Sequence, residues 1–248
     1  MVFKLPQIIG HRGCAGYAPE NTLAGIHTAA DMGIKWVELD VKITKDQVPI
    51  LFHDDDVERT TNTTGPIAEM TLDEVKKLDA GTWFSESFLG TQVPTLHEAI
   101  DAILERDLGL NLEIKACPGR EKETAEVVLD ELSHIWDDHN RLLISSFSHV
   151  SLETAFDMAD DWNRGLLLTA EPPENWQEFA QHLDVSSIHF NGNDANSDFI
   201  AALLETGKQL MAYTINDPGQ AHVLQSLGVR CICSDEPDVI MDGILTVH

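Results

Sequence analysis

Residues 36–54 read WVELDVKITKDQVPILFHD and decide how the rest of the chain is interpreted. Two runs typical of β-strands, Trp36–Thr44 and Val48–His53, are joined by only a few residues around Lys45 and Asp46. A parallel crossover needs a dozen or more residues, so these two runs must form an antiparallel hairpin. The hairpin therefore adds one strand to whatever regular alternation of strands and helices surrounds it.

Outward from the hairpin, strand-like runs alternate with stretches of helical spacing, the pattern of a parallel α/β domain. The other candidate strands are Gln7–Gly10, Asn111–Lys115, Leu142–Phe147, Gly165–Thr169, Ser186–Phe190, Leu210–Ile215 and Arg230–Cys233. The candidate helices are Thr22–Met32, Thr95–Arg106, Glu121–Trp136, Val150–Asp160, Glu174–His182, Ser197–Thr206 and Pro218–Leu227.

Setting one hairpin strand aside leaves eight strands, the number in a closed (β/α)8 TIM barrel. We therefore expect an α/β fold in which residues 1–248 form a single TIM-barrel domain. Residues 54–93 are long, polar and turn-rich, with a short helix expected over Leu72–Leu78. Together with the hairpin they should form a small insertion of loop and helix at the C-terminal mouth, where long loops are often functional.

The charge of the chain restricts its partners. It carries 42 acidic and 16 basic side chains, a formal net charge of −26. Such a surface repels nucleic acid and anionic membranes, so neither is expected as a partner. A phosphate site in this protein must therefore supply its own positive charge, from basic side chains or a metal ion. The sequence does not indicate the oligomeric state.

The N-terminal run MVFKLPQII is too short for a signal peptide, and no run approaches the ~18 apolar residues of a membrane span. Four cysteines, Cys14, Cys117, Cys231 and Cys233, have the spacing of neither a zinc knuckle nor a disulfide framework. Small buried thiols in a reducing cytoplasm are the simplest interpretation, so we expect a cytoplasmic protein.

Polar residues gather where the candidate strands end, and in TIM barrels the active site lies at the C-terminal ends of the strands. Glu38 and Asp40 are two residues apart, so both point to one face of their strand. Glu113 ends another strand and could add a third carboxylate. Three carboxylates suit a hard divalent cation such as Mg²⁺ or Ca²⁺ better than zinc. The alternative is that they are ordinary ion-pair partners of Arg12 and Lys115.

Two histidines are expected near these carboxylates. His11 follows the first strand, and a two-residue turn at Lys45 and Asp46 would place His53 opposite Glu38, whereas a longer turn would shift it by one residue. Two histidines beside a metal ion suit acid–base catalysis near neutral pH. His189 is ambiguous. The histidines expected on helices or loops, without a catalytic role, are His27, His97, His134, His139, His149, His182 and His222.

Two cationic residues lie close to these site residues in the sequence. Arg12 directly follows His11, and Lys115 lies two residues after Glu113. A metal ion with two cationic side chains forms a natural clamp for the negative charge of a phosphodiester. This pair would also explain how so acidic a protein attracts an anion.

The ordered set of motifs resembles the glycerophosphodiester phosphodiesterase family over nearly the whole chain. No single motif is decisive, but their order and spacing are specific. They are His11-Arg12-Gly13, Ala18-Pro19-Glu20-Asn21-Thr22, Glu38-Leu39-Asp40, His53-Asp54, Glu113-Ile114-Lys115, Tyr213-Thr214-Ile215-Asn216 and Ser234-Asp235. Three further stretches, starting at Leu78, Arg164 and Ser187, look like the short, cytosolic bacterial form of the enzyme.

The resemblance implies a hydrolase of lipid and glycerol metabolism that converts glycerophosphocholine or glycerophosphoethanolamine into sn-glycerol 3-phosphate and an alcohol. By motif position, Glu38, Asp40 and Glu113 would bind Mg²⁺, with Ca²⁺ or Mn²⁺ as alternatives. His11 and His53 would be the acid–base pair, and Arg12 and Lys115 would hold the phosphate. Tyr213 stands where the family more often has Trp, and would contact the substrate as an aromatic wall.

Three other functions fit parts of the pattern. A phosphoinositide-cleaving phospholipase would need membrane contact, and the sequence shows no apolar or basic docking patch. A zinc amidohydrolase usually has a His-x-His pair on the first strand, where this chain has His11-Arg12-Gly13. A non-catalytic barrel could bind phosphodiesters, although the intact histidine, carboxylate and cation positions argue against it.

Overall fold

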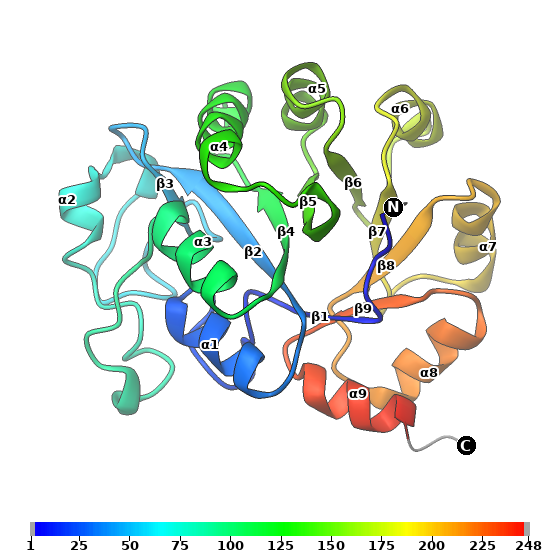
Figure 1. Cartoon of the computed structure of the whole chain (residues 1–248), viewed down its shortest axis with the longest axis horizontal. Coiled ribbons are helices and arrows are strands. Elements are labelled where there is room, and N and C mark those ends of the chain that lie inside the picture. Colours follow the sequence, from blue (N-terminus) through cyan, green and yellow to red (C-terminus); the bar gives the residue numbers. More distant parts are fainter. Residues whose placement is uncertain (1–2, 246–248) are drawn as a thin grey trace.

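The computed structural model describes residues 3–245 and confirms the expected (β/α)8 barrel (Figure 1). Parallel strands form a closed ring in which β1 pairs with both β2 and β9. The ring strands are β1 (Ile8–Gly10), β2 (Trp36–Ile43), β4 (Gly109–Ile114), β5 (Leu142–Ser146), β6 (Asn163–Leu168), β7 (Ser187–Asn191), β8 (Gln209–Tyr213) and β9 (Cys231–Ser234).

Helices surround the ring and alternate with its strands (Figure 1). They are α1 (Leu23–Asp31), α3 (Leu96–Glu105), α4 (Glu121–Ile135), α5 (His149–Met158), α6 (Trp176–His182), α7 (Ser197–Glu205), α8 (Pro218–Ser226) and α9 (Pro237–Leu245). The sequence analysis did not predict α9, which begins at a proline, a residue that tolerates the first helical position. Within residues 3–245, no helix is both long and apolar enough to cross a membrane.

The hairpin formed by β2 and β3 (Pro49–Leu51) is present, but its register is not the one that a two-residue turn would give. Val41 lies opposite Leu51 and Ile43 opposite Pro49, so the partners are shifted by one residue. The turn has three residues, 45–47, because Gln47 adopts a left-handed conformation with φ of 63° and Thr44 N bonds to Val48 O over 3.0 Å. Among the strands of the described residues, β3 pairs with β2 alone, and it stands outside the ring.

Below its mouth, the interior of the barrel is filled largely by apolar side chains. One buried cluster contains Ile9, Trp36, Leu143, Met211 and both Cys231 and Cys233. Trp36 shares its strand face with Glu38 and Asp40, so the carboxylates stand above this apolar layer. The cluster thus forms a dry floor for the mouth of the barrel.

His189 belongs to this floor and not to the mouth. It is fully buried, its Nε2 lies 2.8 Å from the Ser187 hydroxyl, and burial lowers its pKa to about 3. A Cβ atom at Gly165 would lie 2.6 Å from the His189 ring, so a glycine is required there. His189 is therefore a neutral core residue.

The insertion over residues 54–93 has a small core of its own beside the hairpin (Figure 1). It contains the 3-10 turns η1 (Ile67–Glu69) and η2 (Glu86–Phe88), with α2 (Leu72–Val75), shorter than expected, between them. A capping box of Thr71 and Glu74 starts α2. Trp83 and Phe84 pack edge to face, and the Trp83 indole donates to Ala80 O, so this pair contributes to packing within the insertion.

Arg164 is a buried cation that ties β6 to its neighbours. Its guanidinium donates to the carbonyl oxygens of Leu183, Ala159, Trp162 and Asp160 over 2.9–3.2 Å. Arg164→Ala would remove these hydrogen bonds from the buried carbonyl groups and open a cavity. We expect the free energy of unfolding to fall by about 3 kcal/mol, which corresponds to a Tm lowered by roughly 6–12 °C in a chain of this size.

Thermal unfolding of Arg164→Ala beside Arg141→Ala measures this effect. Arg141 forms an exposed ion pair with Asp107 (Nη1 to Oδ1, 2.6 Å), a type of contact with little effect on stability. Equal Tm values for the two variants would show that the buried guanidinium does not stabilise the barrel.

Candidate active site

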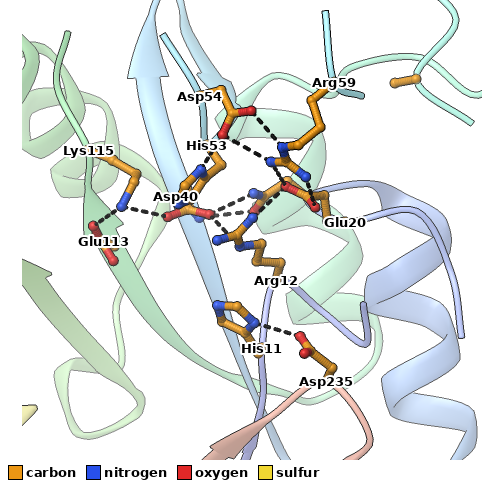
Figure 2. Close-up of polar contacts among 12 residues, drawn as sticks. His11, Arg12, Glu20, Asp40, His53, Asp54, Arg59, Glu113, Lys115 and Asp235 are labelled. Atoms are coloured by element: carbon orange, nitrogen blue, oxygen red, sulfur yellow. Dashed lines mark hydrogen bonds and ion pairs between the residues drawn. The ribbon is translucent and has the colours of Figure 1, made fainter. Parts of the chain in front are cut away.

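Three buried carboxylates meet at the C-terminal mouth of the barrel. Glu38 and Asp40 lie on β2 and Glu113 on β4, with Asp40 directly beside Glu113 in the sheet register. One oxygen atom from each of the three lies within 4.8 Å of the others. Figure 2 shows Asp40 and Glu113 facing one another from their two strands. The predicted carboxylate triplet is thus brought together by neighbouring parallel strands.

The loop after β1 fixes two of these carboxylates. The Arg12 backbone N–H donates to Glu38 Oε2 over 2.9 Å. The Asn21 side chain donates to Asp40 Oδ2 over 2.8 Å, and its own oxygen accepts from the Asp40 N–H over 3.0 Å. Arg12 and Asn21 both adopt left-handed backbone conformations, with φ of 48° and 54°. The loop is therefore bent sharply to reach the carboxylates.

Without a cation, burial and mutual repulsion disfavour the ionised form of the three carboxylates. Desolvation and the charge of Asp40 raise the pKa of both Glu38 and Glu113. Burial acts the same way on Asp40, but Arg12 and Lys115 outweigh it and lower the pKa of Asp40. A hard divalent cation would relieve this repulsion, and its preferred ligands are carboxylate oxygens. The donor set therefore fits a divalent metal ion.

Each predicted histidine is held through Nδ1 by a carboxylate. His11 Nδ1 lies 2.7 Å from Asp235 Oδ1, and His53 Nδ1 lies 2.5 Å from Asp54 Oδ1. The pKa values of Asp54 and Asp235 are both lowered, so these carboxylates are ionised acceptors and each Nδ1 is the donor. The Nε2 atom of each ring remains available, and His11 Nε2 lies 3.9 Å from Glu38.

The pKa values of the two histidine rings are shifted in opposite directions. Burial alone would lower the pKa of His11, but the hydrogen bond to Asp235 and the charge of Glu38 raise it overall. Desolvation dominates at His53, where the nearby Arg12 and Lys115 charges also act, and the pKa of His53 is lowered. The negative charge of Asp40 also acts on His53 and opposes this lowering of its pKa. His53 therefore lies near the carboxylates, although the hairpin register is shifted by one residue.

Arg12 and Lys115 stand on either side of Asp40 (Figure 2). Lys115 Nζ lies 2.8 Å from Glu113 and 3.9 Å from Asp40. Arg12 Nη1 contacts Glu20 Oε1 over 2.7 Å, and its Nε lies 3.4 Å from Asp40 but has no hydrogen-bond partner. Both the clamp and the ion-pair interpretations of these cations therefore have a structural basis.

The ionic network reaches beyond the triplet (Figure 2). It joins five carboxylates to three cationic side chains. The carboxylates are Glu20, Glu38, Asp40, Asp54 and Glu113, and the cations are Arg12, Arg59 and Lys115. Asp235 contacts His11, whose pKa is raised. With all five carboxylates ionised, as they would be as ligands of a metal ion, this network lacks two positive charges, the charge of one divalent cation.

Tyr213 lies near Glu113 at the end of β8, but its hydroxyl is already engaged. The hydroxyl donates to Leu168 O over 2.8 Å, while burial and the charge of Glu113 raise its pKa. Its ring packs edge to face against Phe147 at 6.1 Å, and Lys115 Nζ lies 5.4 Å above the Phe147 ring. The Tyr213 ring is thus part of an aromatic cluster with Phe147 beside Lys115.

A cavity opens on each side of the carboxylate cluster. One, of about 510 Å³, is lined by residues including His53, Glu113, Lys115 and Phe147. The other, of about 400 Å³, is lined by residues including His11, Arg12, Asn216 and Asp235. A larger cavity of about 870 Å³ lies at the opposite end of the barrel, beside Lys208 and Arg230, and contains none of these groups.

Several residues of the site were not assigned a role from the sequence, most of them because their contacts join distant parts of the chain. Asp235 meets His11 across 224 positions of sequence, and Asn216 donates to Asp235 over 2.8 Å. Glu20, Asn21, Asp54, Asn216 and Asp235 stood within the family-like motifs, which was the signal that could have found them. Arg59 carried no such signal.

Glu38→Gln should change how the stability of the metal-free protein depends on pH. Desolvation and the Asp40 charge raise the pKa of Glu38 from 4.5 to about 8. The folded state therefore keeps a proton that the unfolded chain gives up. This stabilising contribution is complete below pH 4.5 and is lost as the pH rises toward about 8. Glutamine is neutral throughout, so the loss should be smaller in the variant.

Thermal unfolding in EDTA between about pH 5 and pH 8 tests this expectation. The difference in Tm between Glu38→Gln and the wild type should grow in favour of the variant as the pH rises. Parallel Tm curves would show that Glu38 is ionised in both states and that the triplet is not repulsive.

Comparisons with known proteins agree with this geometry. The model of the glycerophosphoryl diester phosphodiesterase family matches residues 11–239. A glycerophosphodiester phosphodiesterase of Caldanaerobacter subterraneus is 33% identical over 95% of this chain and 96% of its own. One from Bacillus subtilis is 30% identical over 93% of this chain and 84% of its own. The solved structure of an Oleispira antarctica phosphodiesterase, in complex with the product sn-glycerol-3-phosphate, is 39% identical with a TM-score of 0.93, covering 98% of both chains.

Proposed function

The chain belongs to the glycerophosphoryl diester phosphodiesterase family, and from this we propose that its barrel mouth hydrolyses glycerophosphocholine and glycerophosphoethanolamine. The products would be sn-glycerol 3-phosphate and the free alcohol. The enzyme is a phosphoric diester hydrolase by its family and its relatives. The observation that carries the proposal is that carboxylates, histidines and cations from β1, β2, β3 and β4 converge at one mouth between two cavities.

The phosphate would be held by cations on both sides. Glu38, Asp40 and Glu113 would bind the divalent ion, for which we propose Mg²⁺, with Ca²⁺ or Mn²⁺ as possible substitutes. When bound, such an ion acts as a Lewis acid that polarises a phosphoryl oxygen. Arg12 and Lys115 would donate to the remaining phosphate oxygens, and their fixed charges would stabilise the negative charge that grows as phosphorus is attacked.

The two histidines would exchange the protons of the reaction. Asp54 and Asp235 hold Nδ1 of each ring, which leaves Nε2 of His53 and His11 as the exchanging atoms. One ring takes the proton of the attacking hydroxyl as the other gives a proton to the departing alkoxide. The attacking group would be either water, which gives sn-glycerol 3-phosphate directly, or the glycerol 2-hydroxyl, which the family mechanism is often drawn to use and which gives a cyclic phosphate that water then opens.

The cavities on either side of the cluster favour a diester as the substrate. A diester carries two alcohol groups on phosphorus, and each cavity could take one of them. Zinc amidohydrolase chemistry is disfavoured, because the metal-ligating group found within residues 3–245 contains carboxylates and neither His nor Cys. A cytoplasmic location and the lack of nucleic-acid or membrane partners stay predictions of the sequence.

Product identification tests the function directly. The purified enzyme would be stripped with EDTA and then given Mg²⁺ and one of three substrates: glycerophosphocholine, glycerophosphoethanolamine or phosphatidylinositol vesicles. We expect sn-glycerol 3-phosphate and free alcohol from the first two and no reaction with the vesicles. Release of inositol phosphates instead would indicate a phospholipase, and no reaction with any of the three would reject the proposal.

A further inference from the structure

Arg59 makes two bidentate contacts at the edge of the site. It is the sole arginine among residues 54–93, and it lies on the insertion (Figure 2). Its Nε and Nη2 donate to the two Asp54 oxygens over 2.6 and 3.0 Å. Its Nη1 and Nη2 donate to the two Glu20 oxygens, each over 2.7 Å. Every nitrogen of the guanidinium is thus engaged, although 44% of the side chain is exposed.

The contact with Asp54 leads to His53. Asp54 Oδ1 accepts from His53 Nδ1 over 2.5 Å while it also accepts from Arg59. A lone aspartate beside a histidine can rotate away from the ring. The bidentate contact with Arg59 fixes the plane of the carboxylate, and with it the orientation of the imidazole. It also keeps Asp54 ionised, so that Asp54 accepts and the proton of neutral His53 stays on Nδ1.

The contact with Glu20 leads to Arg12. Glu20 Oε1 accepts from both Arg59 Nη2 and Arg12 Nη1, each over 2.7 Å. Glu20 is thereby shared between two guanidinium groups, and its negative charge does not cancel that of Arg12 alone. The loop after β1, which carries His11 and Arg12, is thus tied to the end of the hairpin, which carries His53.

We propose that Arg59 is a positioning residue that couples His53, through Asp54, to Arg12, through Glu20, and so sets the spacing of the two sides of the active site. This inference rests on the proposed function. Arg59 does not contact the carboxylate triplet in the described contacts, and it acts through its neighbours. Lysine could not replace it, because an ammonium group is a point charge and cannot place a planar fork on two carboxylates at once.

Steady-state kinetics of Arg59→Ala and Arg59→Lys tests the coupling. We expect kcat to fall about 10–100-fold in Arg59→Ala, with a smaller change in KM, and to recover only in part in Arg59→Lys. Arg141→Ala, which removes a similarly exposed arginine from an ion pair with Asp107, should keep the wild-type kcat. Wild-type kcat in Arg59→Ala would overturn the proposal, and wild-type kcat in Arg59→Lys would overturn the role of the fork.

The tautomer of His53 distinguishes a positioning role of Arg59 from a merely structural one, because loss of a structural contact alone would not change the tautomer. Nitrogen-15 NMR of the metal-free protein, at a pH where His53 is neutral, should show the proton on Nδ1 in the wild type. In Arg59→Ala we expect a shift of the proton toward Nε2. His11, held by Asp235, should keep its Nδ1 proton in both proteins and is the internal control. An unchanged His53 signal in Arg59→Ala would overturn the proposal.

These two measurements separate the inference from the function it rests on. A wild-type enzyme that releases no sn-glycerol 3-phosphate would reject the proposed function, yet the NMR signal would still decide whether Arg59 orients His53. A wild-type enzyme that is active, with an equally active Arg59→Ala, would reject the inference alone.

Discussion

Replacing His53 with alanine is expected to lower kcat by about 10²–10⁴-fold, the usual contribution of a positioned general acid or base. The same loss is expected for His11→Ala. Both rings approach the site through Nε2, since Asp54 and Asp235 occupy Nδ1. In the proposed mechanism each ring carries out one of two proton transfers, so a variant that lacks one ring would lose that transfer. Steady-state kinetics with glycerophosphoethanolamine at saturating Mg²⁺ measures the effect.

The stability of the two variants should change little, because both side chains lie at the mouth and not in the barrel core. The side chain of His11 is 18% exposed and that of His53 is 26% exposed. His222→Ala provides a matched control, because His222 is an exposed residue of α8. A near-normal kcat in either His11→Ala or His53→Ala would remove that histidine from the mechanism.

Asp40→Asn is expected to weaken the binding of a divalent cation by at least about 100-fold and to lower kcat with it. Asp40 lies at the centre of the network, beside Glu113 in the register and within 4 Å of Arg12 and Lys115. Asparagine preserves the shape but removes the charge, and loss of a ligand should exceed the 10–100-fold effect typical of residues that merely orient one. Calorimetric titration of the EDTA-stripped protein with Mg²⁺ or Mn²⁺ measures the affinity.

The result also decides between the two interpretations of the triplet. If the carboxylates were only ion-pair partners of Arg12 and Lys115, the wild type would bind no cation at this site. Asp130→Asn is the control, because Asp130 is an exposed residue of α4 and its loss removes the same formal charge. Equal affinities in Asp40→Asn and Asp130→Asn would exclude Asp40 as a ligand.

Local pattern predicted most of the fold and the centre of the site. The parallel strands alternate with helices as expected, and strand periodicity correctly placed Glu38 and Asp40 on one face. Position at a strand end identified His11 and Glu113, because the ends of parallel strands in a barrel meet at one mouth.

The pattern left open or missed what depends on more than local sequence. It left the hairpin turn open between two residues and a longer loop, because Gln47 takes a left-handed conformation that glycine or asparagine would have signalled and glutamine does not. Asp235 and Asn216 were not assigned roles, since only the closed ring brings β9 beside β1, with β8 on the other side of β9. Arg59 was missed because an isolated arginine in a polar insertion has the same pattern as any solvated side chain.

The account depends most on a divalent cation held by Glu38, Asp40 and Glu113 between His11 and His53. Anomalous diffraction from a crystal grown with Mn²⁺ and sn-glycerol 3-phosphate tests this arrangement in one measurement. The account predicts a manganese peak among the three carboxylates, with a phosphate oxygen bound to it and with Nε2 of both histidines facing the phosphate. A peak elsewhere, or a phosphate bound away from the three carboxylates, would contradict it.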